Sequence, residues 1–204
     1  MKLYPPIKRL ADILVSASLL LMLSPLLLLT ALFIKITSPG PVFFVQLRGG
    51  HNGRHFTIYK FRSMRVEHKH DPTEFMPLDN PNITTFGRII RRTKIDELPQ
   101  LFNVLIGDMS LIGPRPTLIE QIERYNELER RRLNVRPGCT GLAQVNGSTA
   151  LSWPERIEWD VHYVNHLSPW LDLAILIKTV GGIILGEPRF QRRHADVYKS
   201  NTRR

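Results

Sequence analysis

The sequence predicts an α+β protein: a small, mostly helical domain with a short β-hairpin, attached to a membrane through its N-terminal segment. Three observations predict this. Residues 13–34 form an uninterrupted apolar run. Residues 42–48, rich in Val and Phe, and residues 55–61 flank the turn sequence GGHNG, as in a hairpin. From Ile95 onward, apolar residues recur at helical spacing.

The N-terminal apolar run is long enough to cross a bilayer. Lys8 and Arg9 precede it, Lys35 follows it, and no charge interrupts residues 13–34. About 20 apolar residues suffice for a spanning helix, so one transmembrane helix is the simplest interpretation. A cleaved signal peptide is not expected, because the run is longer than a usual signal core and no small-residue cleavage site follows it.

Two features of this run favour a helix that enters the membrane, breaks and returns. Ser24 and Pro25 lie in its middle, and proline bends a helix by removing a backbone hydrogen bond. Lys2, Lys8 and Arg9 favour the cytoplasmic side, as does the basic domain after Lys35. Proline is also common in spanning helices, so from the residues alone both topologies stay open.

The next segment reads as a hairpin followed by a polar loop. The sequence SPGP at 38–41 breaks the chain before the first strand. GGHNG is interpreted as a turn, since a phosphate-binding loop would lie between a strand and a helix and carry a following Lys-Ser/Thr. His68 and His70 lie in the polar stretch 68–81 beside Asp71, where a solvated loop is a better interpretation than a metal site.

The residues best suited to catalysis and phosphate binding are concentrated between residues 88 and 116. Asp96 and Glu97 are adjacent, and four basic residues precede them: Arg88, Arg91, Arg92 and Lys94. A helix from about Ile95 would place Ile95, Leu98, Leu101, Phe102 and Leu105 on one face, and Asp96, Gln100 and Asn103 on the other. An acidic pair in a first helical turn often only complements the helix dipole. Together with the cations and with Arg115 between Pro114 and Pro116, the pair points to a site for phosphate and a divalent metal.

The C-terminal half predicts three further helices. Residues 118–133 read as one surface helix, whose basic triplet Arg130–Arg132 faces lipid headgroups or solvent. Residues 153–166 read as a helix in which His162 and His166 share a face, with a structural role favoured over metal binding. Residues 169–185 suit an interfacial amphipathic helix, with a core helix as the rival interpretation.

Composition narrows the classes of partner. The 204 residues carry a formal net charge of +10, which favours an anionic partner such as an acidic membrane surface or a phosphorylated substrate. The single cysteine, Cys139, excludes an intramolecular disulfide and is interpreted as a packed residue on the reducing cytosolic side. No nucleic-acid partner is expected, because the chain has no helix-turn-helix, zinc-finger or RNA-binding signature.

Three motifs resemble the signature of a known family. They are KFRSM at 60–64, DELPQLFNVLIGDMSLIGPRP at 96–116 and RPGCTGLAQVNG at 136–147, the last expected to form a loop with short strands. The chain resembles the bacterial sugar transferases of the monotopic phosphoglycosyl transferase family over residues 8–185. The resemblance implies a re-entrant membrane helix broken at Ser24 and Pro25, with Asp172 close to Lys8 or Arg9. It divides the chain into a membrane segment (1–37), a catalytic domain (38–186) and a basic tail (187–204).

The resemblance also implies the reaction. A UDP-sugar would give its sugar-1-phosphate to a polyprenol phosphate such as undecaprenyl phosphate, releasing UMP, with Mg²⁺ as cofactor. Asp96 would be the nucleophile and, with Glu97, would hold the metal. Glu97, also a catalytic residue, would orient the metal or act as a base toward the lipid phosphate. The expected substrate-binding residues are Arg115, Arg91, Lys60, Arg62, Arg136 and Gln144.

The same resemblance implies the location and the remaining partners. The enzyme would sit in the bacterial inner (cytoplasmic) membrane with its catalytic domain on the cytoplasmic face. Its partners would be membrane phospholipids and downstream glycosyltransferases. The alternative is a membrane-tethered module that binds anionic lipid or nucleic acid, or a scaffold, without catalysis; it gives no reason for the acidic pair amid the basic cluster.

Overall fold

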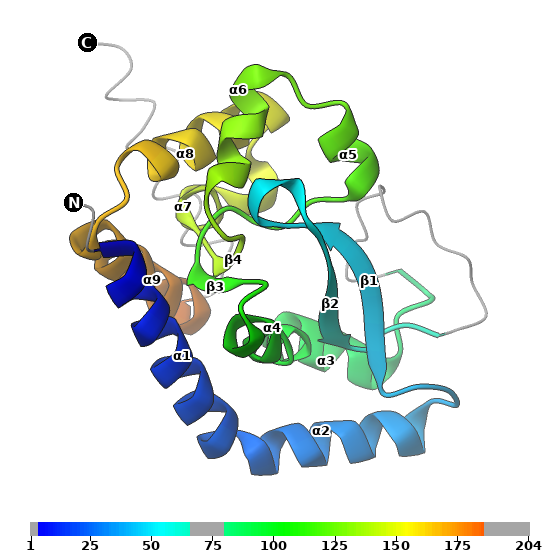
Figure 1. Ribbon diagram of the computed structural model, residues 1–204. Helices are drawn as coiled ribbons and strands as arrows, with labels where there is room; N and C mark the ends of the chain where they lie inside the picture. Colours follow the sequence, from blue (N-terminus) through cyan, green and yellow to red (C-terminus); the bar gives the residue numbers. More distant parts are fainter. Residues whose placement is uncertain (1–3, 66–79, 186–204) are drawn as a thin grey trace.

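The computed structural model describes residues 4–65 and 80–185. It confirms the α+β class, with helices arranged around a two-stranded hairpin and a second, smaller pair of strands (Figure 1). His68, His70 and the tail from residue 187 lie outside the described residues, so the predictions made for them stay predictions.

The N-terminal segment forms two helices, α1 (Tyr4–Met22) and α2 (Ser24–Thr37), which meet at an angle of 61°. The bend has a local cause. Pro25 has no N–H to donate to the carbonyl of Leu21, four residues earlier. The hydroxyl of Ser24 donates to that carbonyl instead, at 2.8 Å. The Ser-Pro pair therefore breaks the helix and satisfies the acceptor that the break exposes.

The hairpin consists of β1 (Phe43–Gly49) and β2 (His55–Phe61), paired antiparallel from Phe43↔Phe61 to Gly49↔His55. The GGHNG sequence is the turn, as predicted, with a short 3₁₀ turn at His51–Gly53. Asn52 and Gly53 have φ angles of 55° and 74°, which the reversal of the chain requires and which asparagine and glycine tolerate best.

The segment predicted as one helix from Ile95 is divided. Helix α3 (Thr85–Arg92) ends before Lys94, whose φ of 59° reverses the chain into a 3₁₀ turn, η2 (Ile95–Glu97). Helix α4 (Gln100–Ile106) begins only after Pro99.

The buried face of α4 mixes polar and apolar side chains. Gln100 and Asn103 are 3% and 0% exposed and lie beside the buried Leu101 and Val104, whereas Phe102 and Ile106 are exposed. Asn103 is buried because its side chain bonds the backbone of β2, accepting from Tyr59 N (3.1 Å) and donating to Thr57 O (2.7 Å).

The next segment contains two parallel strands joined by short helices. β3 (Ser110–Ile112) pairs with β4 (Gly138–Thr140). The single surface helix predicted for residues 118–133 is wrong: the chain forms α5 (Ile119–Glu123), α6 (Glu127–Arg130) and a 3₁₀ turn, η3 (Arg131–Asn134). The break has a capping origin, because Asn126 and Glu129 exchange side-chain to backbone hydrogen bonds, both at 2.9 Å, and start a new helix.

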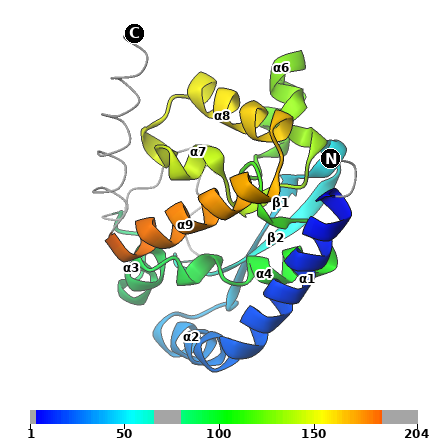
Figure 2. The ribbon, with the colours of Figure 1, turned by 90° about the vertical axis from the view of Figure 1, so that its left-hand side faces the viewer.

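The C-terminal helices agree with the sequence. After α7 (Leu142–Val145) and a 3₁₀ turn (Ser148–Ala150), α8 (Trp153–Asn165) and α9 (Pro169–Leu185) follow. Figure 2 shows α9 running beside α7, which it contacts. Tyr163 and Ile175, 1% and 0% exposed, lie in the core between these helices and β3, with Ile112, Leu142 and Val145.

Helix α1 packs on the rest of the protein rather than standing apart from it. The guanidinium of Arg9 donates to the carbonyls of Val104 (2.6 Å) and Leu105 (3.0 Å) at the end of α4. The buried carboxylate of Asp12 accepts from Leu111 N at 3.1 Å. The predicted boundary at residue 37 is therefore crossed by polar contacts, and the three-part division stays a prediction.

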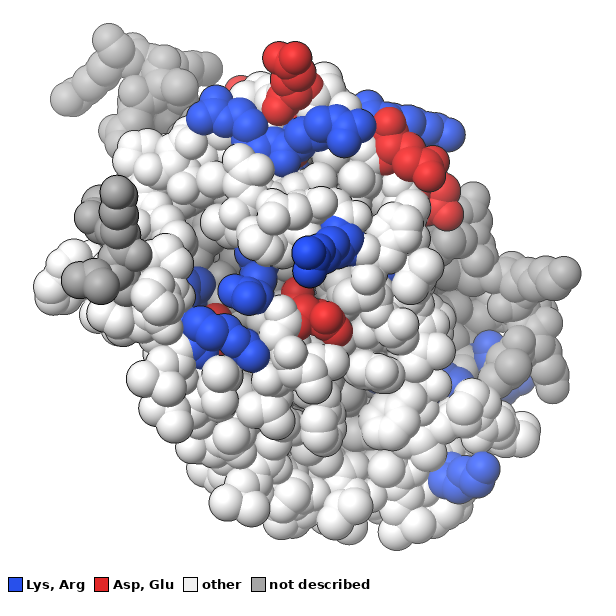
Figure 3. Space-filling view, in the orientation of Figure 1, with Lys and Arg blue, Asp and Glu red and all other residues white. Residues whose placement is uncertain are grey.

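The outer surface of three helices is apolar. Among the described residues, no single helix has the length and apolarity to span a membrane, whereas α1 and α2 together meet both criteria as a bent pair. Their exposed side chains include Leu14, Leu21, Leu28 and Leu32, and α9 exposes Trp170, Ile177 and Ile183. Figure 3 shows few charged side chains over α1 and α2, and more in the middle and upper parts of the same face.

Candidate active site

Asp96 and Glu97 lie in η2, the short turn between α3 and α4. The left-handed backbone of Lys94 turns the chain so that both carboxylates are held beneath the hairpin, with Asp96 only 9% exposed. η2 packs against β2, which carries Lys60. The acidic pair is thus part of a buried polar region and not a solvated helix start.

Glu97 connects three segments of the chain. Its Oε1 accepts a hydrogen bond from Lys60 Nζ on β2 and another from Arg115 Nη2, both at 2.8 Å. Burial alone would raise the pKa of Glu97, but Arg115 and Lys60 outweigh it and hold that pKa well below its usual range. Glu97 is therefore ionised at neutral pH and fixes the two cations in place.

Asp96 has the opposite environment. Burial, with the neighbouring Glu97 charge, raises its pKa to about 6, against the lowering effect of Lys60, Arg91 and Lys94. Its Oδ1 is buried and has no hydrogen-bond partner among the described residues. Asp96 is still mostly ionised at pH 7, with an oxygen available for a ligand or an electrophile.

Arg91, on helix α3, acts on this carboxylate electrostatically and opposes the rise of its pKa. Its Nη1 is buried and lacks a hydrogen-bond partner within the described part of the chain. Arg88 and Arg92, on the same helix, are exposed. The structure thus separates one arginine of the basic cluster from the two at the surface.

Arg48 is a residue of this region that the sequence analysis missed. It is half-buried in β1, and its Nη2 donates to Gln46 Oε1 at 2.5 Å. Burial, then the nearby charge of Arg115, lowers its pKa, while Glu120 and Glu97 oppose the shift. A charged residue near the end of a mostly apolar strand was the available signal.

Three other expected site residues have structural partners. Arg62 donates to the carbonyls of Ser38 (2.7 Å) and Pro39, holding the connection between α2 and β1. Arg136 donates to the carbonyl of Gly107 at 2.9 Å, and Gln144 to that of Cys139 at 3.1 Å. The structure does not bring these three side chains onto the acidic pair, and their substrate-binding roles stay predictions.

Cys139 fits its interpretation as a packed residue. Burial raises the pKa of its thiol to about 12, and the charges of Glu97 and Asp12 act in the same direction. A thiol in that state is a poor nucleophile.

The expected contact between Asp172 and the N-terminal cations is present. Lys8 Nζ lies 2.8 Å from Asp172 Oδ2, and the hydroxyl of Tyr163 lies 2.8 Å from Asp172 Oδ1. Arg9 is engaged elsewhere, at the end of α4. The ion pair joins α1 to α9, two of the three helices with apolar outer surfaces.

The side chains at the acidic pair could bind a divalent cation at Asp96, but they do not form a complete set of protein ligands around it. Within residues 4–65 and 80–185, no group of three or more His, Cys, Asp or Glu side chains could hold a metal. His162 and His166 stack on each other with ring centroids 4.1 Å apart. The unpartnered Asp96 oxygen, with Glu97 beside it, suits a hard cation such as Mg²⁺, which commonly binds one or two carboxylates together with water and substrate phosphates.

Comparisons with known proteins agree with the motifs. The family model described as bacterial sugar transferase matches residues 3–186. An uncharacterized sugar transferase, EpsL of Bacillus subtilis, is 44% identical over 188 residues, covering 92% of both chains.

Two relatives carry names that state a reaction. A UDP-N-acetylgalactosamine-undecaprenyl-phosphate N-acetylgalactosaminephosphotransferase of Aeromonas hydrophila is 44% identical, covering 90% of this chain and 45% of the relative. A UDP-glucose:undecaprenyl-phosphate glucose-1-phosphate transferase of Klebsiella pneumoniae is 44% identical, covering 85% and 39%. The chain spans less than half the length of these two relatives.

Proposed function

The chain belongs to the bacterial sugar transferase family, and we propose that it transfers sugar-1-phosphate from a UDP-sugar to undecaprenyl phosphate, releasing UMP. The observation that carries the proposal is the arrangement around the acidic pair. One carboxylate, Glu97, is bound by Lys60 and Arg115. The other, Asp96, keeps a buried oxygen that has no hydrogen-bond partner in the described part of the chain. Relatives named for this reaction supply the substrate class.

Asp96 is the nucleophile in this proposal. A carboxylate oxygen attacks the phosphorus that carries the sugar, an O–P bond forms, and the diphosphate P–O bond breaks with its electron pair leaving on UMP. The acceptor phosphate oxygen then attacks the same phosphorus, the Asp96 O–P bond breaks, and the carboxylate is regenerated. The raised pKa of Asp96 supports this role, because a more basic carboxylate is a better nucleophile and is still ionised at pH 7.

Glu97 organises the site rather than serving as a base. Its pKa is held well below the usual range, so it has little tendency to take a proton from the acceptor phosphate. By fixing Lys60 and Arg115 it presents two cations to the donor diphosphate. Arg91 adds an N–H group that no described residue accepts. The guanidinium of Arg115 suits bidentate contact with phosphate oxygens.

Mg²⁺ is the proposed cofactor, held by Asp96 with Glu97 beside it. It would neutralise diphosphate charge while the bond to UMP breaks. The protein residues themselves bind the donor and orient its phosphorus toward Asp96.

The membrane location follows from the acceptor, whose phosphate lies at the surface of a bilayer. We propose that α1 and α2 enter and leave the cytoplasmic leaflet of the inner membrane as a bent pair, with α9 at the interface. Their apolar outer surfaces and the 61° bend at Ser24 and Pro25 support this placement. It would hold the acidic pair at headgroup depth.

The decisive test is the intact mass of the protein after incubation with Mg²⁺ and a panel of UDP-sugars, without a lipid acceptor. We expect an adduct of one phosphosugar, mapped to the peptide that contains Asp96, and no adduct in Asp96→Asn. UMP release that requires the lipid, without any adduct, would favour direct transfer and leave Asp96 as a metal ligand. An active Asp96→Asn protein would remove the nucleophile role of Asp96. No adduct and no UMP, with or without the lipid, would reopen the binding-module or scaffold interpretation.

A further inference from the structure

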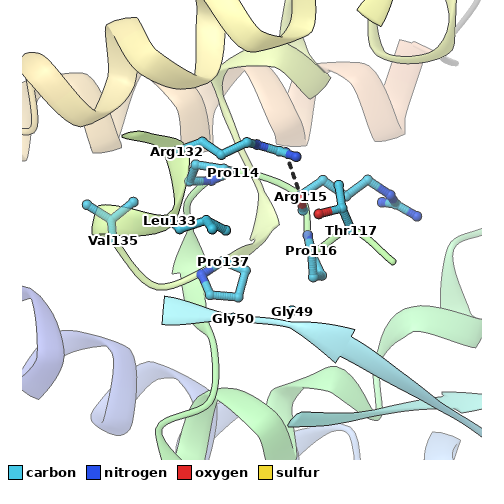
Figure 4. A pocket seen from close by; sticks show the side chains of 10 residues that line it. All are labelled: Gly49, Gly50, Pro114, Arg115, Pro116, Thr117, Arg132, Leu133, Val135 and Pro137. Atoms are coloured by element: carbon cyan, nitrogen blue, oxygen red, sulfur yellow. Dashed lines mark hydrogen bonds between the residues drawn. The ribbon is translucent and has the colours of Figure 1, made fainter. Parts of the chain in front are cut away.

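Three carbonyl groups hold the backbone of the loop that carries Arg115. This Arg115 loop, residues 114–117, contains two prolines that donate no N–H. Pro114 O accepts from Gly138 N (2.9 Å), and Thr117 O accepts from Gly49 N (3.0 Å). The carbonyl of Arg115 itself accepts from a side chain, Arg132 Nη2, at 2.9 Å (Figure 4).

Arg132 is a buried guanidinium with a fixed orientation. Only 4% of the residue is exposed. Its Nη2 also lies 2.6 Å from Asp160 Oδ2, and its Nη1 donates to the hydroxyl of Tyr125 at 2.6 Å. The guanidinium carbon lies 5.8 Å from the Tyr125 ring centre and 5.5 Å from that of Trp153.

Tyr125 provides a second link to the same loop. Its hydroxyl accepts from Arg132 and lies 2.7 Å from Thr117 Oγ1, so its single proton is free to be donated to Thr117. The Arg132 cluster, comprising Arg132, Asp160 and Tyr125, thus contacts the Arg115 loop at two positions on either side of Pro116. The sequence analysis placed Arg132 with the lipid-facing or solvated triplet; Arg130 and Arg131 are exposed, but Arg132 is not.

The cluster is better suited to fixing geometry than to adding stability. Burying an ion pair costs desolvation free energy that its attraction often does no more than repay. Arg132 is too buried to reach a substrate, yet one of its N–H groups bonds the backbone of the residue that holds Glu97. A displacement of about 1 Å in such a group can cost about 100-fold in rate.

We propose that Arg132, oriented by Asp160 and Tyr125, is a positioning residue for Arg115. By holding the Arg115 carbonyl, it sets where the Arg115 guanidinium meets Glu97 and the donor diphosphate. The inference rests on the proposed function for its catalytic consequence, but the positioning itself is a property of the fold.

The kinetic test compares the effect of Arg132→Lys in two backgrounds, the native chain and Arg115→Lys. We expect kcat/KM for UMP release to fall about tenfold or more in the native chain, and less than about threefold when Arg115 is already altered, because coupled residues are not additive. Tyr125→Phe, which keeps the ring, should show the same pattern more weakly. Arg131→Lys, at an exposed neighbour, is the matched control. Equal losses in both backgrounds would overturn the inference, since a purely structural role lowers both alike.

A second readout does not depend on turnover. The rate at which butanedione modifies Arg115, followed by peptide mass analysis below the melting temperature of each variant, should rise severalfold in Arg132→Lys and in Tyr125→Phe but not in Arg131→Lys. An unchanged rate in both variants would overturn the positioning role. No UMP release by the native chain, together with the expected change in modification rate, would instead count against the proposed function alone.

Discussion

At the scale of single residues, two adjacent carboxylates differ because of their partners. Glu97 has two cations on one oxygen, and its pKa is held well below the usual range. Asp96 is buried, one of its oxygens has no hydrogen-bond partner among the residues that the structure describes, and its pKa is raised to about 6. One backbone turn thus presents a carboxylate that organises cations and a carboxylate that is poised to react. Buried carboxylates with pKa values shifted in this way are common at functional sites.

The free-energy cost of burying the ionised Asp96 side chain predicts that removing its charge stabilises the fold. The folded pKa of about 6 exceeds the ordinary value of 3.8, so the folded state binds the proton more tightly than the unfolded state does. Ionised Asp96 therefore destabilises the protein above about pH 6 by up to about 3 kcal/mol, and the cost fades below about pH 4. We expect Asp96→Asn to melt several degrees higher than the native chain at pH 7.5, with EDTA present, and at the same temperature near pH 4.

The measurement is differential scanning fluorimetry of the detergent-solubilised protein at both pH values. Glu158→Gln, at an exposed position on α8, is the control for removing one negative charge. A lower melting temperature for Asp96→Asn at pH 7.5 would mean that the folded state compensates the Asp96 charge fully.

At the scale of elements, helix α4 supplies hydrogen-bond partners to the open edge of the hairpin. Within residues 4–65 and 80–185, strand β2 has only β1 as a strand neighbour, so its other edge needs different partners. Asn103, fully buried, pairs with Tyr59 N and Thr57 O on that edge. These two hydrogen bonds explain why a polar side chain of α4 points inward. They also fix the position of Lys60 of β2 relative to η2.

We expect Asn103→Leu to destabilise the protein by about 2–4 kcal/mol, because it leaves a buried N–H and a buried carbonyl unpaired. The melting temperature should fall by about 5 °C or more. Phe102→Leu, on the exposed face of the same helix, should change it by far less. Similar melting temperatures for the two variants would show that water or a shifted backbone replaces both hydrogen bonds.

At the scale of the whole molecule, polar contacts of α1 with α9 and α4 connect the apolar surface to the candidate active site. Lys8 joins α1 to Asp172 of α9, and Arg9 joins α1 to the end of α4. Helix α4 in turn follows directly from the turn with Asp96. The position of the proposed membrane segment therefore determines the position of the acidic pair.

This arrangement predicts that both ends of the N-terminal segment lie on one side of the membrane. In a Cys139→Ala background, single cysteines at the exposed positions Pro5 and Arg54 should react with an impermeant maleimide from the same side of oriented vesicles. Replacing both Ser24 and Pro25 by Leu should straighten the helix and move the Pro5 label to the opposite side. Labelling of the unaltered segment from opposite sides would exclude re-entry.

The sequence alone determined the features that depend on neighbouring residues. The hairpin turn at GGHNG, the break at Ser24 and Pro25, and the last two helices follow from turn chemistry, proline and periodicity, and the motifs around Asp96 identified the family.

Only the tertiary structure decided which charged groups meet. Lys60 and Arg115 reach Glu97 from 37 and 18 residues away, Arg132 is buried beneath the Arg115 loop, and Arg62 supports the connection to β1 instead of the acidic pair. A local pattern identifies these residues as charged, but their burial, partners and pKa values arise from chain segments that the fold brings together.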